Sequence, residues 1–318
     1  MTHDPLASSD VIAERRFACA KAVAKGGDLS AAADLFEQAL ERAPSWAAAW
    51  FALGETREKL GDLDGAAAAF GATVAADPAD AHGAAARLAL IGHGGVPDVL
   101  PQAYVARLFD GYAPRFDKHL TKNLLYRGPA LIGAALDAVA PGRRFASAVD
   151  LGCGTGLVGE ALRGRIDYLT GVDLSPAMIV KARERGVYDR LIVGDATTLL
   201  MSEPPGVFDL IVAADALVYV GDLAPLFAAA GTALVADGLF TFSVETFVGD
   251  GFRLEPTMRF AHARSYVEAT ASEAGLRPLL VQSARARREA GADVPGLICV
   301  LETAERRNGA EGSRAALG

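Results

Sequence analysis

The sequence predicts an α/β domain that follows a small all-α stack of helices. The first observation is a series of short apolar segments, three of which end on an acid: Asp150, Asp173 and Asp195. Helical patterns follow these segments, and strands that alternate with helices build a parallel sheet. The second observation is a glycine-rich loop directly after the first segment. The third is a repeat with a shift of 34 residues near the start of the chain, which is typical of stacked helix pairs.

The glycine-rich loop lies in the segment AVDLGCGTGLVGE, residues 148–160. After the acid Asp150 the chain runs into three glycines: Gly152, Gly154 and Gly156. Glycines let the main chain turn sharply and let a ligand approach it closely, and the N-terminus of the following helix offers free N–H groups. The loop is therefore expected to bind a nucleoside-like cofactor. Its glycines also match the dinucleotide-binding spacing, so the loop alone leaves a dehydrogenase open.

The next apolar segments separate these two hypotheses. The second strand ends at Asp173 and is followed by Ser175 and Pro176, which suit the N-cap and the first turn of a helix. The third strand ends at Asp195, and the fourth is expected over residues 210–213. Acids at the carboxyl ends of parallel strands line the crevice where open α/β sheets hold ligands. A dehydrogenase explains Asp173 but not Asp195, and we find no second domain with a catalytic His or Lys arrangement.

Residues 104–302 resemble the class I S-adenosylmethionine-dependent methyltransferases. The acid and glycines of the loop, the acid that closes the second strand and the Gly-Asp-Ala that closes the third carry the resemblance. It implies a seven-stranded Rossmann-like sheet with helices on both faces and an antiparallel last strand. It also implies that the protein is a methyltransferase with S-adenosyl-L-methionine as its cofactor.

The resemblance also implies roles for individual residues. Asp173 would accept both ribose hydroxyls, and Asp195 with Ala196 would face the adenine. Asp150 would order the loop or reach the cofactor through water. The residues expected at the cofactor are Tyr112, Asp150, Gly152, Cys153, Gly154, Gly156, Asp173, Leu174, Met178, Asp195, Ala196 and Ala214.

Catalytic residues are expected where the methyl donor meets its acceptor. Transfer needs alignment in a dry pocket, and a neutral hydroxyl acceptor also needs a base. His262 is the first candidate, because it follows the fifth strand on a segment expected to be a loop above the acceptor pocket. A helix cap or a substrate contact is the alternative role for this histidine. Asp215 and His119 are the further candidates, and the resemblance points Asp215 and Tyr219 toward the methyl donor.

The segment after the fourth strand, AADALVYVGDL, bears on the acceptor. It lacks the motifs associated with methylation of nucleobase amino groups, of cytosine C5 or of protein arginine. The resemblance therefore implies a small-molecule acceptor with a hydroxyl, a carboxyl or an activated carbon, and hence O- or C-methylation. Two alternatives stay open: a protein methyltransferase recruited through the repeats, and a non-catalytic adaptor that only binds S-adenosylmethionine. Fold alone does not name the acceptor.

The repeat region resembles two tetratricopeptide (TPR) repeats. The tripeptide Gly-Asp-Leu at residues 27–29 recurs at residues 61–63. The second copy matches the TPR signature spacing at Trp50, Leu53, Gly54, Ala66, Phe70 and Pro78. Residues 81–93 are expected to form a capping helix. Two repeats are fewer than the roughly three that a stable stack needs. The stack is therefore expected to pack on the enzyme, to bind a protein partner or to form a homodimer; its alanine-rich groove favours packing.

The segment between the two regions is expected to cover the cofactor. Apolar and aromatic residues recur there at helical spacing: Leu108, Phe109, Tyr112, Phe116 and Leu120. The resemblance places Tyr112 at the cofactor's carboxylate and Phe116 over it, and ordinary helix packing is the alternative. We therefore divide the chain into a disordered N-terminus (1–9), a TPR-like helical domain (10–94), a linker with lid helices (95–130), a methyltransferase domain (131–303) and a disordered tail (304–318).

The composition predicts a cytoplasmic enzyme. The chain has 318 residues, of which 51% are hydrophobic, so it can bury two substantial cores. It has neither an apolar run of about 18 residues, as a membrane span needs, nor the apolar stretch of a signal peptide at residues 1–16. The net charge of −8 argues against a large nucleic-acid surface. Cys19, Cys153 and Cys299 show no metal or disulfide spacing, so no metal, nucleic acid or membrane partner is expected.

Overall fold

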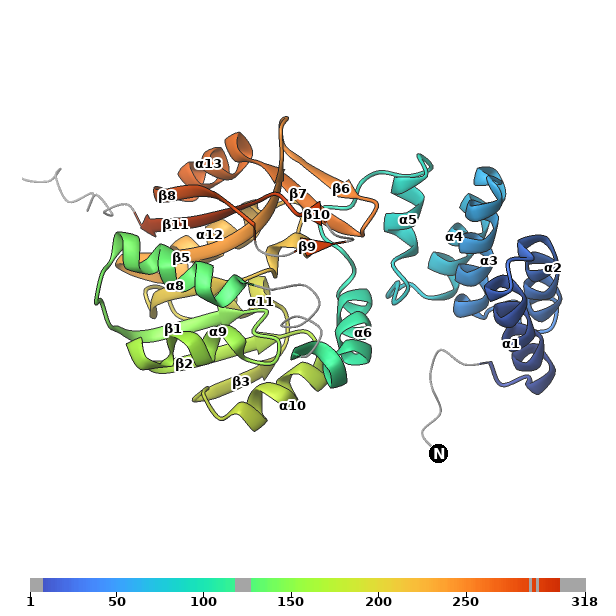
Figure 1. The fold of residues 1–318 in the computed structure, drawn as a ribbon, viewed down its shortest axis with the longest axis horizontal. Coiled ribbons are helices and arrows are strands. Elements are labelled where there is room, and N and C mark those ends of the chain that lie inside the picture. Colours follow the sequence, from blue (N-terminus) through green and yellow to red (C-terminus); the bar gives the residue numbers. More distant parts are fainter. Residues whose placement is uncertain (1–7, 118–126, 286–287, 290–291, 304–318) are drawn as a thin grey trace, which may run out of the picture.

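The computed structural model describes residues 8–117, 127–285, 288–289 and 292–303. Figure 1 shows a helical stack at one end of the molecule and a larger α/β region at the other, with α6 (Gln102–Tyr112) between them. The predicted disordered ends fall almost wholly outside the described residues. No helix within the described ranges is long and apolar enough to cross a membrane.

The stack consists of two antiparallel helix pairs and a short fifth helix. Its helices are α1 (Val11–Lys25), α2 (Leu29–Leu40), α3 (Ala47–Leu60), α4 (Leu63–Ala76) and α5 (Ala84–Leu90). The repeated Gly-Asp-Leu begins a helix in each copy, because Asp28 and Asp62 accept the N–H groups of Ala31 and Gly65, both at 3.0 Å. Gly54 is required because a Cβ there would lie 2.6 Å from the ring of Phe70. The predicted helical stack is confirmed.

The α/β region is built on one twisted sheet. Its seven principal strands are β1 (Phe145–Leu151), β2 (Ile166–Asp173), β3 (Arg190–Val193), β4 (Phe208–Ala213), β5 (Leu234–Phe247), β8 (Leu276–Ala284) and β11 (Gly296–Thr303). They lie in the order β3-β2-β1-β4-β5-β11-β8. The first five run parallel, and β11 is antiparallel to both β5 and β8. The predicted seven-stranded arrangement with an antiparallel last strand is confirmed.

Helices cover both faces of this sheet and bury two apolar layers. The helices are α8 (Gly128–Val139), α9 (Leu157–Leu162), α10 (Pro176–Arg185), α11 (Ala196–Ser202), α12 (Ala224–Ala233) and α13 (Arg264–Glu273), with three 3-10 turns, η1 (Ala113–Arg115), η2 (Arg163–Arg165) and η3 (Leu217–Tyr219). One layer packs α11, α12 and α13 against the sheet around Phe227, Phe240 and Phe242. The other packs α8 and α9 around Leu136 and Phe145. Ser175 caps α10 as predicted, since its Oγ accepts from the Met178 N–H at 3.1 Å.

A hairpin extends the sheet where the sequence analysis expected a loop. Strands β6 (Phe252–Glu255) and β7 (Arg259–Ala263) pair antiparallel, and β7 also runs parallel to the end of β5. The expectation of a loop over residues 259–263 is therefore wrong. The segment is only five residues long, and its pairing with β5 is long-range. A short pair of strands, β9 (Arg288–Glu289) and β10 (Ala292–Asp293), lies outside this sheet.

The helical stack meets the α/β region through one small apolar cluster. In Figure 1, α5 stands beside β6 and near α6. Six buried side chains from α5, the linker, α6 and the β6–β7 hairpin form the cluster: Ala86, Leu100, Val105, Leu254, Met258 and Phe260. Met258 has a positive φ of 59° at the turn of the hairpin. The stack is thus packed against the segment that covers one end of the sheet.

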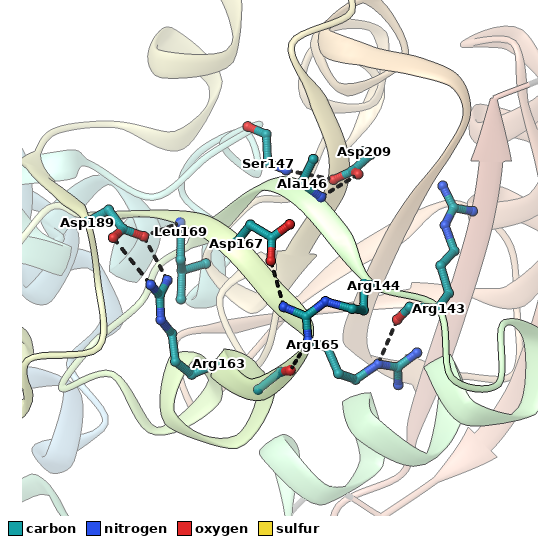
Figure 2. A network of polar contacts seen from close by, with 11 residues as sticks. Arg143, Arg144, Ala146, Ser147, Arg163, Arg165, Asp167, Leu169, Asp189 and Asp209 are labelled. Atoms are coloured by element: carbon teal, nitrogen blue, oxygen red, sulfur yellow. Dashed lines mark hydrogen bonds and ion pairs between the residues drawn. The ribbon is translucent and has the colours of Figure 1, made fainter.

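The amino-terminal edge of the sheet is held by polar contacts, which Figure 2 shows. Asp209 of β4 accepts the main-chain N–H groups of Ala146 at 2.7 Å and Ser147 at 3.0 Å. Arg163 pairs with Asp189 at 2.7 Å, and Asp189 also accepts the N–H of Leu169. Exposed ion pairs contribute only about 0–1 kcal/mol each. These contacts therefore fix the strand starts and leave the opposite edge open for a ligand.

Candidate functional site

A cavity of about 410 Å³ lies at the carboxyl edge of the sheet. The ends of β1, β2, β3 and β4 form its floor, and α6, η1 and the β6–β7 turn cover it. The predicted site residues that line it are Tyr112, Gly152, Cys153, Gly154, Asp173, Leu174, Asp195, Ala196, Ala214 and Asp215. Those that do not line it are Asp150, Gly156, Met178 and His262. His119 lies outside the described residues.

Gly152 and Gly154 shape the floor of the cavity between β1 and α9. Both have positive φ, 67° and 53°, which glycine adopts without the steric cost of a Cβ. A Cβ on Gly152 would lie 2.6 Å from that of Ala216, and a Cβ on Gly154 would reach within 3.6 Å of the Phe116 ring. The gap between Gly154 and Phe116 is therefore a narrow slot, which a side chain at residue 154 would fill.

Asp173 ties the end of β2 to this loop. One carboxylate oxygen accepts the N–H of Gly154 at 2.9 Å, and the other accepts that of Ser175 at 2.8 Å. The residue is only 8% exposed, and burial raises the pKa of its carboxyl. Each carboxylate oxygen has a second lone pair, so Asp173 can also accept hydroxyl groups from the cavity.

The other two strand-end acids, Asp195 and Asp150, differ in their position, because only Asp195 lines the cavity. Asp195 lines the cavity and caps α11 by accepting the N–H and the hydroxyl of Thr198, both at 2.8 Å. Asp150 lies beneath the loop instead, where its carboxylate accepts the Tyr188 hydroxyl at 2.7 Å. Burial raises the pKa of Asp150 to about 7. This position fits the expectation that Asp150 orders the loop, and a contact with the cofactor through water stays a prediction.

Two further cofactor candidates support the cavity from outside its wall. Gly156 has a φ of 92° and starts α9, and a Cβ there would lie 2.9 Å from the Tyr188 ring. Met178 is a fully buried residue of α10. Neither residue lines the cavity, so their contact with the cofactor stays a prediction.

The lid formed by α6 and η1 is fastened to the α/β region by two acids. Asp110 accepts the Ser175 hydroxyl at 2.5 Å and the Ala177 N–H at 3.1 Å. Asp117 accepts the Thr155 hydroxyl at 2.5 Å and pairs with Arg185 at 2.6 Å. Tyr112 and Phe116 line the cavity from this lid, and their rings meet edge to face with centroids 5.4 Å apart.

The far end of the cavity holds an ion-pair cluster that the sequence analysis missed. Arg259 of β7 donates from Nη2 to Asp215 at 2.5 Å, from Nε to Glu245 at 2.6 Å and from Nη1 to the Tyr219 hydroxyl at 3.1 Å. Burial disfavours the guanidinium charge, but Asp215, Tyr219 and Glu245 outweigh it and raise the pKa of Arg259. Arg259 and Asp215 both line the cavity.

The predicted base His262 is not at the cavity. It lies on β7 and is fully buried, and its Nε2 lies 2.9 Å from the Val220 carbonyl oxygen and 3.1 Å from that of Gly221. Carbonyls only accept, so Nε2 carries the hydrogen; Nδ1 is buried with no hydrogen-bond partner among the described residues. Burial lowers the pKa of His262 to about 4. The histidine holds η3 against β7 as a neutral ring, and its expected loop position is corrected.

Comparison with known proteins agrees with this geometry. Residues 148–238 match the family model described as a methyltransferase domain, and residues 24–90 match a tetratricopeptide repeat. The human methyltransferase-like protein 27 is 34% identical over 125 residues, which are 39% of this chain and 49% of that protein. Malonyl-[acyl-carrier protein] O-methyltransferase of Enterobacter lignolyticus is 34% identical over 116 residues, or 36% of this chain and 43% of its own. The chain thus spans half or less of the length of these relatives.

Among solved structures, the 1,6-didemethyltoxoflavin-N1-methyltransferase of Burkholderia thailandensis matches with a TM-score of 0.50 and 19% identity, covering 66% of this chain and 93% of its own. That enzyme was solved with its substrate and S-adenosylhomocysteine. At this identity the likeness concerns the fold. The chain therefore carries a tetratricopeptide repeat region followed by a methyltransferase domain with the fold of S-adenosylmethionine-dependent enzymes.

The first prediction concerns Asp173. Asp173→Ala removes a charged acceptor and releases the Gly154 N–H, and such bonds contribute about 1.5–3 kcal/mol. Calorimetry should therefore show the affinity for S-adenosylhomocysteine falling about ten- to a hundredfold. Asp167→Ala is the matched control, because Asp167 lies on the same strand and pairs with Arg144 on the surface. Equal affinities of the two variants would contradict the role of Asp173.

The second prediction concerns His262. Because its folded pKa of about 4 lies below the ordinary value of 6.5, its neutral state supports folding above pH 6.5, and this contribution is lost as the pH falls toward 4. In the parent, this protonation lowers the free energy of unfolding by at most about 1.4 kcal/mol per pH unit. His262→Gln should remove this pH dependence. The variant should also lose about 1–3 kcal/mol of unfolding free energy at pH 7.5.

Denaturant unfolding between pH 4.5 and 7.5 measures both effects. His93→Gln is the control, since His93 is exposed. Affinity for S-adenosylhomocysteine should be unchanged in the His262 variant. A parallel pH dependence in parent and His262→Gln would show that the ring is not held neutral.

Proposed function

We propose that the chain is an S-adenosylmethionine-dependent methyltransferase that methylates a small molecule at oxygen or carbon. The observation that carries this proposal is the single cavity in which the glycine loop, Asp173 and Asp195 meet under an aromatic lid. The methyltransferase domain match supports the same conclusion.

The residues present fit the cofactor. Asp173 offers carboxylate oxygens to hydroxyls, Asp195 and Ala196 border the next strand end, and glycine at residue 154 keeps a side chain out of the slot beside Phe116. Tyr112 lies in the lid above this slot as a candidate for the cofactor's carboxylate. When bound, S-adenosylmethionine supplies an electrophilic methyl group. The chain contributes alignment and exclusion of water, which can be worth about 7–11 kcal/mol of the barrier.

A small acceptor fits the enclosure better than a folded protein. The cavity of about 410 Å³ is within the usual range for small-molecule sites, about 300–1,000 Å³. The lid and the β6–β7 turn cover the end that Asp215 lines. The Enterobacter relative is named an O-methyltransferase, which supports transfer to oxygen. A repeat-recruited protein methyltransferase and a non-catalytic adaptor are the competing functions.

We propose packing as the role of the helical stack, ahead of partner binding or dimerisation. Its last helix supports two side chains that line the cavity, Tyr104 and Met258. A Cβ on Gly83, at the start of α5, would lie 2.9 Å from the Tyr104 ring and 3.0 Å from Met258. The stack thus forms a second layer behind the wall of the cavity.

A labelling experiment tests the proposed function. The protein is incubated with a metabolite extract and methyl-labelled S-adenosylmethionine, and labelled products are identified by mass spectrometry. We expect one labelled small molecule, and none with Asp173→Ala at the same cofactor concentration. A labelled protein in place of a metabolite would favour recruitment through the repeats. Tight cofactor binding without any labelled product would favour the adaptor.

A pair of glycine variants tests the packing role. Gly83 and Gly92 both have positive φ, 72° and 81°, so alanine at either costs about 1–2 kcal/mol of backbone strain. Only Gly83→Ala also pushes on Tyr104 and Met258, since nothing lies within 4 Å of a Cβ at Gly92. Gly83→Ala should weaken S-adenosylhomocysteine binding about three- to tenfold relative to Gly92→Ala, or about 0.6–1.4 kcal/mol. Equal affinities of the two variants for S-adenosylhomocysteine would contradict the proposal that the stack supports the cavity wall.

A further inference from the structure

We propose that Asp215, held by Arg259, makes the acceptor end of the cavity select a neutral or cationic acceptor that donates a hydrogen bond, and reject a carboxylate. The acceptor would be a phenol or an alcohol, with or without a separate cationic group. This inference rests on the proposed function and names the acceptor class for the same cavity.

The strand order separates the two ends of the cavity. Along the carboxyl edge lie Asp195 after β3, Asp173 at the end of β2, the glycine loop after β1 and Asp215 after β4, and β7 pairs with the end of β5 on the side away from β11. The cofactor candidates occupy the edge from β3 to β1. The acceptor is left with the region from β4 to β7, where Asp215 and Arg259 line the wall.

Arg259 is already engaged by the protein, because each of its three nitrogens donates one hydrogen bond to a protein oxygen, which leaves one further N–H on Nη1 and one on Nη2. Nε donates to Glu245, Nη1 to Tyr219 and Nη2 to Asp215. The side chains of Arg259 and Glu245 are 12% and 13% exposed. A carboxylate on the acceptor would therefore become a third carboxylate at one guanidinium, whose charge Asp215 and Glu245 already share.

Carboxylates outnumber cations among the described residues that line the cavity. The charged residues in its lining are Asp173, Asp195, Asp215 and Arg259. Arg259 also pairs with Glu245, so two carboxylates share one guanidinium at the acceptor end and leave a surplus negative charge. Like charges in a poorly solvated site repel strongly. An anionic acceptor is disfavoured, whereas an O–H or N–H donor is attracted.

Asp215 is held in place to receive that donor. Its φ of 56° is uncommon for a residue with a side chain, and such strain persists only where neighbours over-determine the conformation. Its N–H donates to the Ser243 hydroxyl at 2.9 Å, and its carboxylate is fixed by Arg259. Its side chain is still 20% exposed, so a ligand can reach it. Arg259 thus acts as a positioning residue and Asp215 as the group that contacts the acceptor.

Three ring probes of similar size test the selection: 4-ethylphenol, 2-phenylethylamine and 3-phenylpropionate. Their dissociation constants are measured by NMR titration of the full chain, with and without S-adenosylhomocysteine. We expect the phenol and the amine to bind at least about tenfold more tightly than the carboxylate. Asp215→Asn should shrink the ratio of amine to carboxylate affinity to within about threefold, whereas S-adenosylhomocysteine affinity should change little.

Glu255→Gln is the matched control, since it removes one carboxylate charge, paired with Arg253 on β6, from outside the cavity lining. The Glu255→Gln variant should keep the parent's ratio of amine to carboxylate affinity. Arg259→Lys keeps the charge but cannot donate to three oxygens in one plane, so its ratio should fall between those of the parent and Asp215→Asn. If the Asp215 variant does not fold, the comparison of probes on the parent carries the test alone.

A carboxylate that binds as tightly as the amine would overturn the inference, and so would a cavity that binds none of the three probes. Both outcomes are judged from probe titrations of the protein with and without S-adenosylhomocysteine. Failure of S-adenosylhomocysteine to bind would instead overturn the proposed function, and the probe ratios would still report on Asp215.

Discussion

The site depends on one buried carboxylate. Asp173 accepts main-chain N–H groups from Gly154 and Ser175, so it joins the loop after β1, the end of β2 and the start of α10. The helix start is joined in turn to the lid, because Asp110 accepts from Ser175 and Ala177. Without this carboxylate the glycine loop would lose the hydrogen bond that ties Gly154 to the end of β2. The floor of the cavity is therefore held in position by the hydrogen bonds that Asp173 accepts within the protein.

The lid is also held by contacts with other parts of the chain. Asp117 joins it to the Thr155 hydroxyl of the glycine loop and to Arg185, and α5 supports it from the side of the helical stack through the cluster around Met258. The cavity is thus built from three separate parts of the chain. The floor comes from the sheet, the cover from α6 and η1, and the outer wall from a hairpin packed against the stack.

The sequence predicted the parts of the site that carry local signals. The glycine loop and the strand-end acids Asp173 and Asp195 are each readable within a few residues, and so is the cap at Ser175. Arg259 has no such signal, because its partners Asp215, Tyr219 and Glu245 lie on other elements and meet it only after β7 pairs with β5. His262 was misplaced for the same reason: RFAHA is too short to indicate a strand by itself. The direction of Asp150 depends on Tyr188, which is also distant in sequence.

Calorimetric titration of the parent protein with S-adenosylhomocysteine, with NAD titrated separately, tests the central claim most directly. Both ligands carry an adenosine, so the comparison asks whether the loop, Asp173 and the lid form a site for the methyl donor and not for a dinucleotide. The account predicts one S-adenosylhomocysteine per chain and no saturable NAD binding. Saturable binding of NAD, or no binding of S-adenosylhomocysteine, would contradict it.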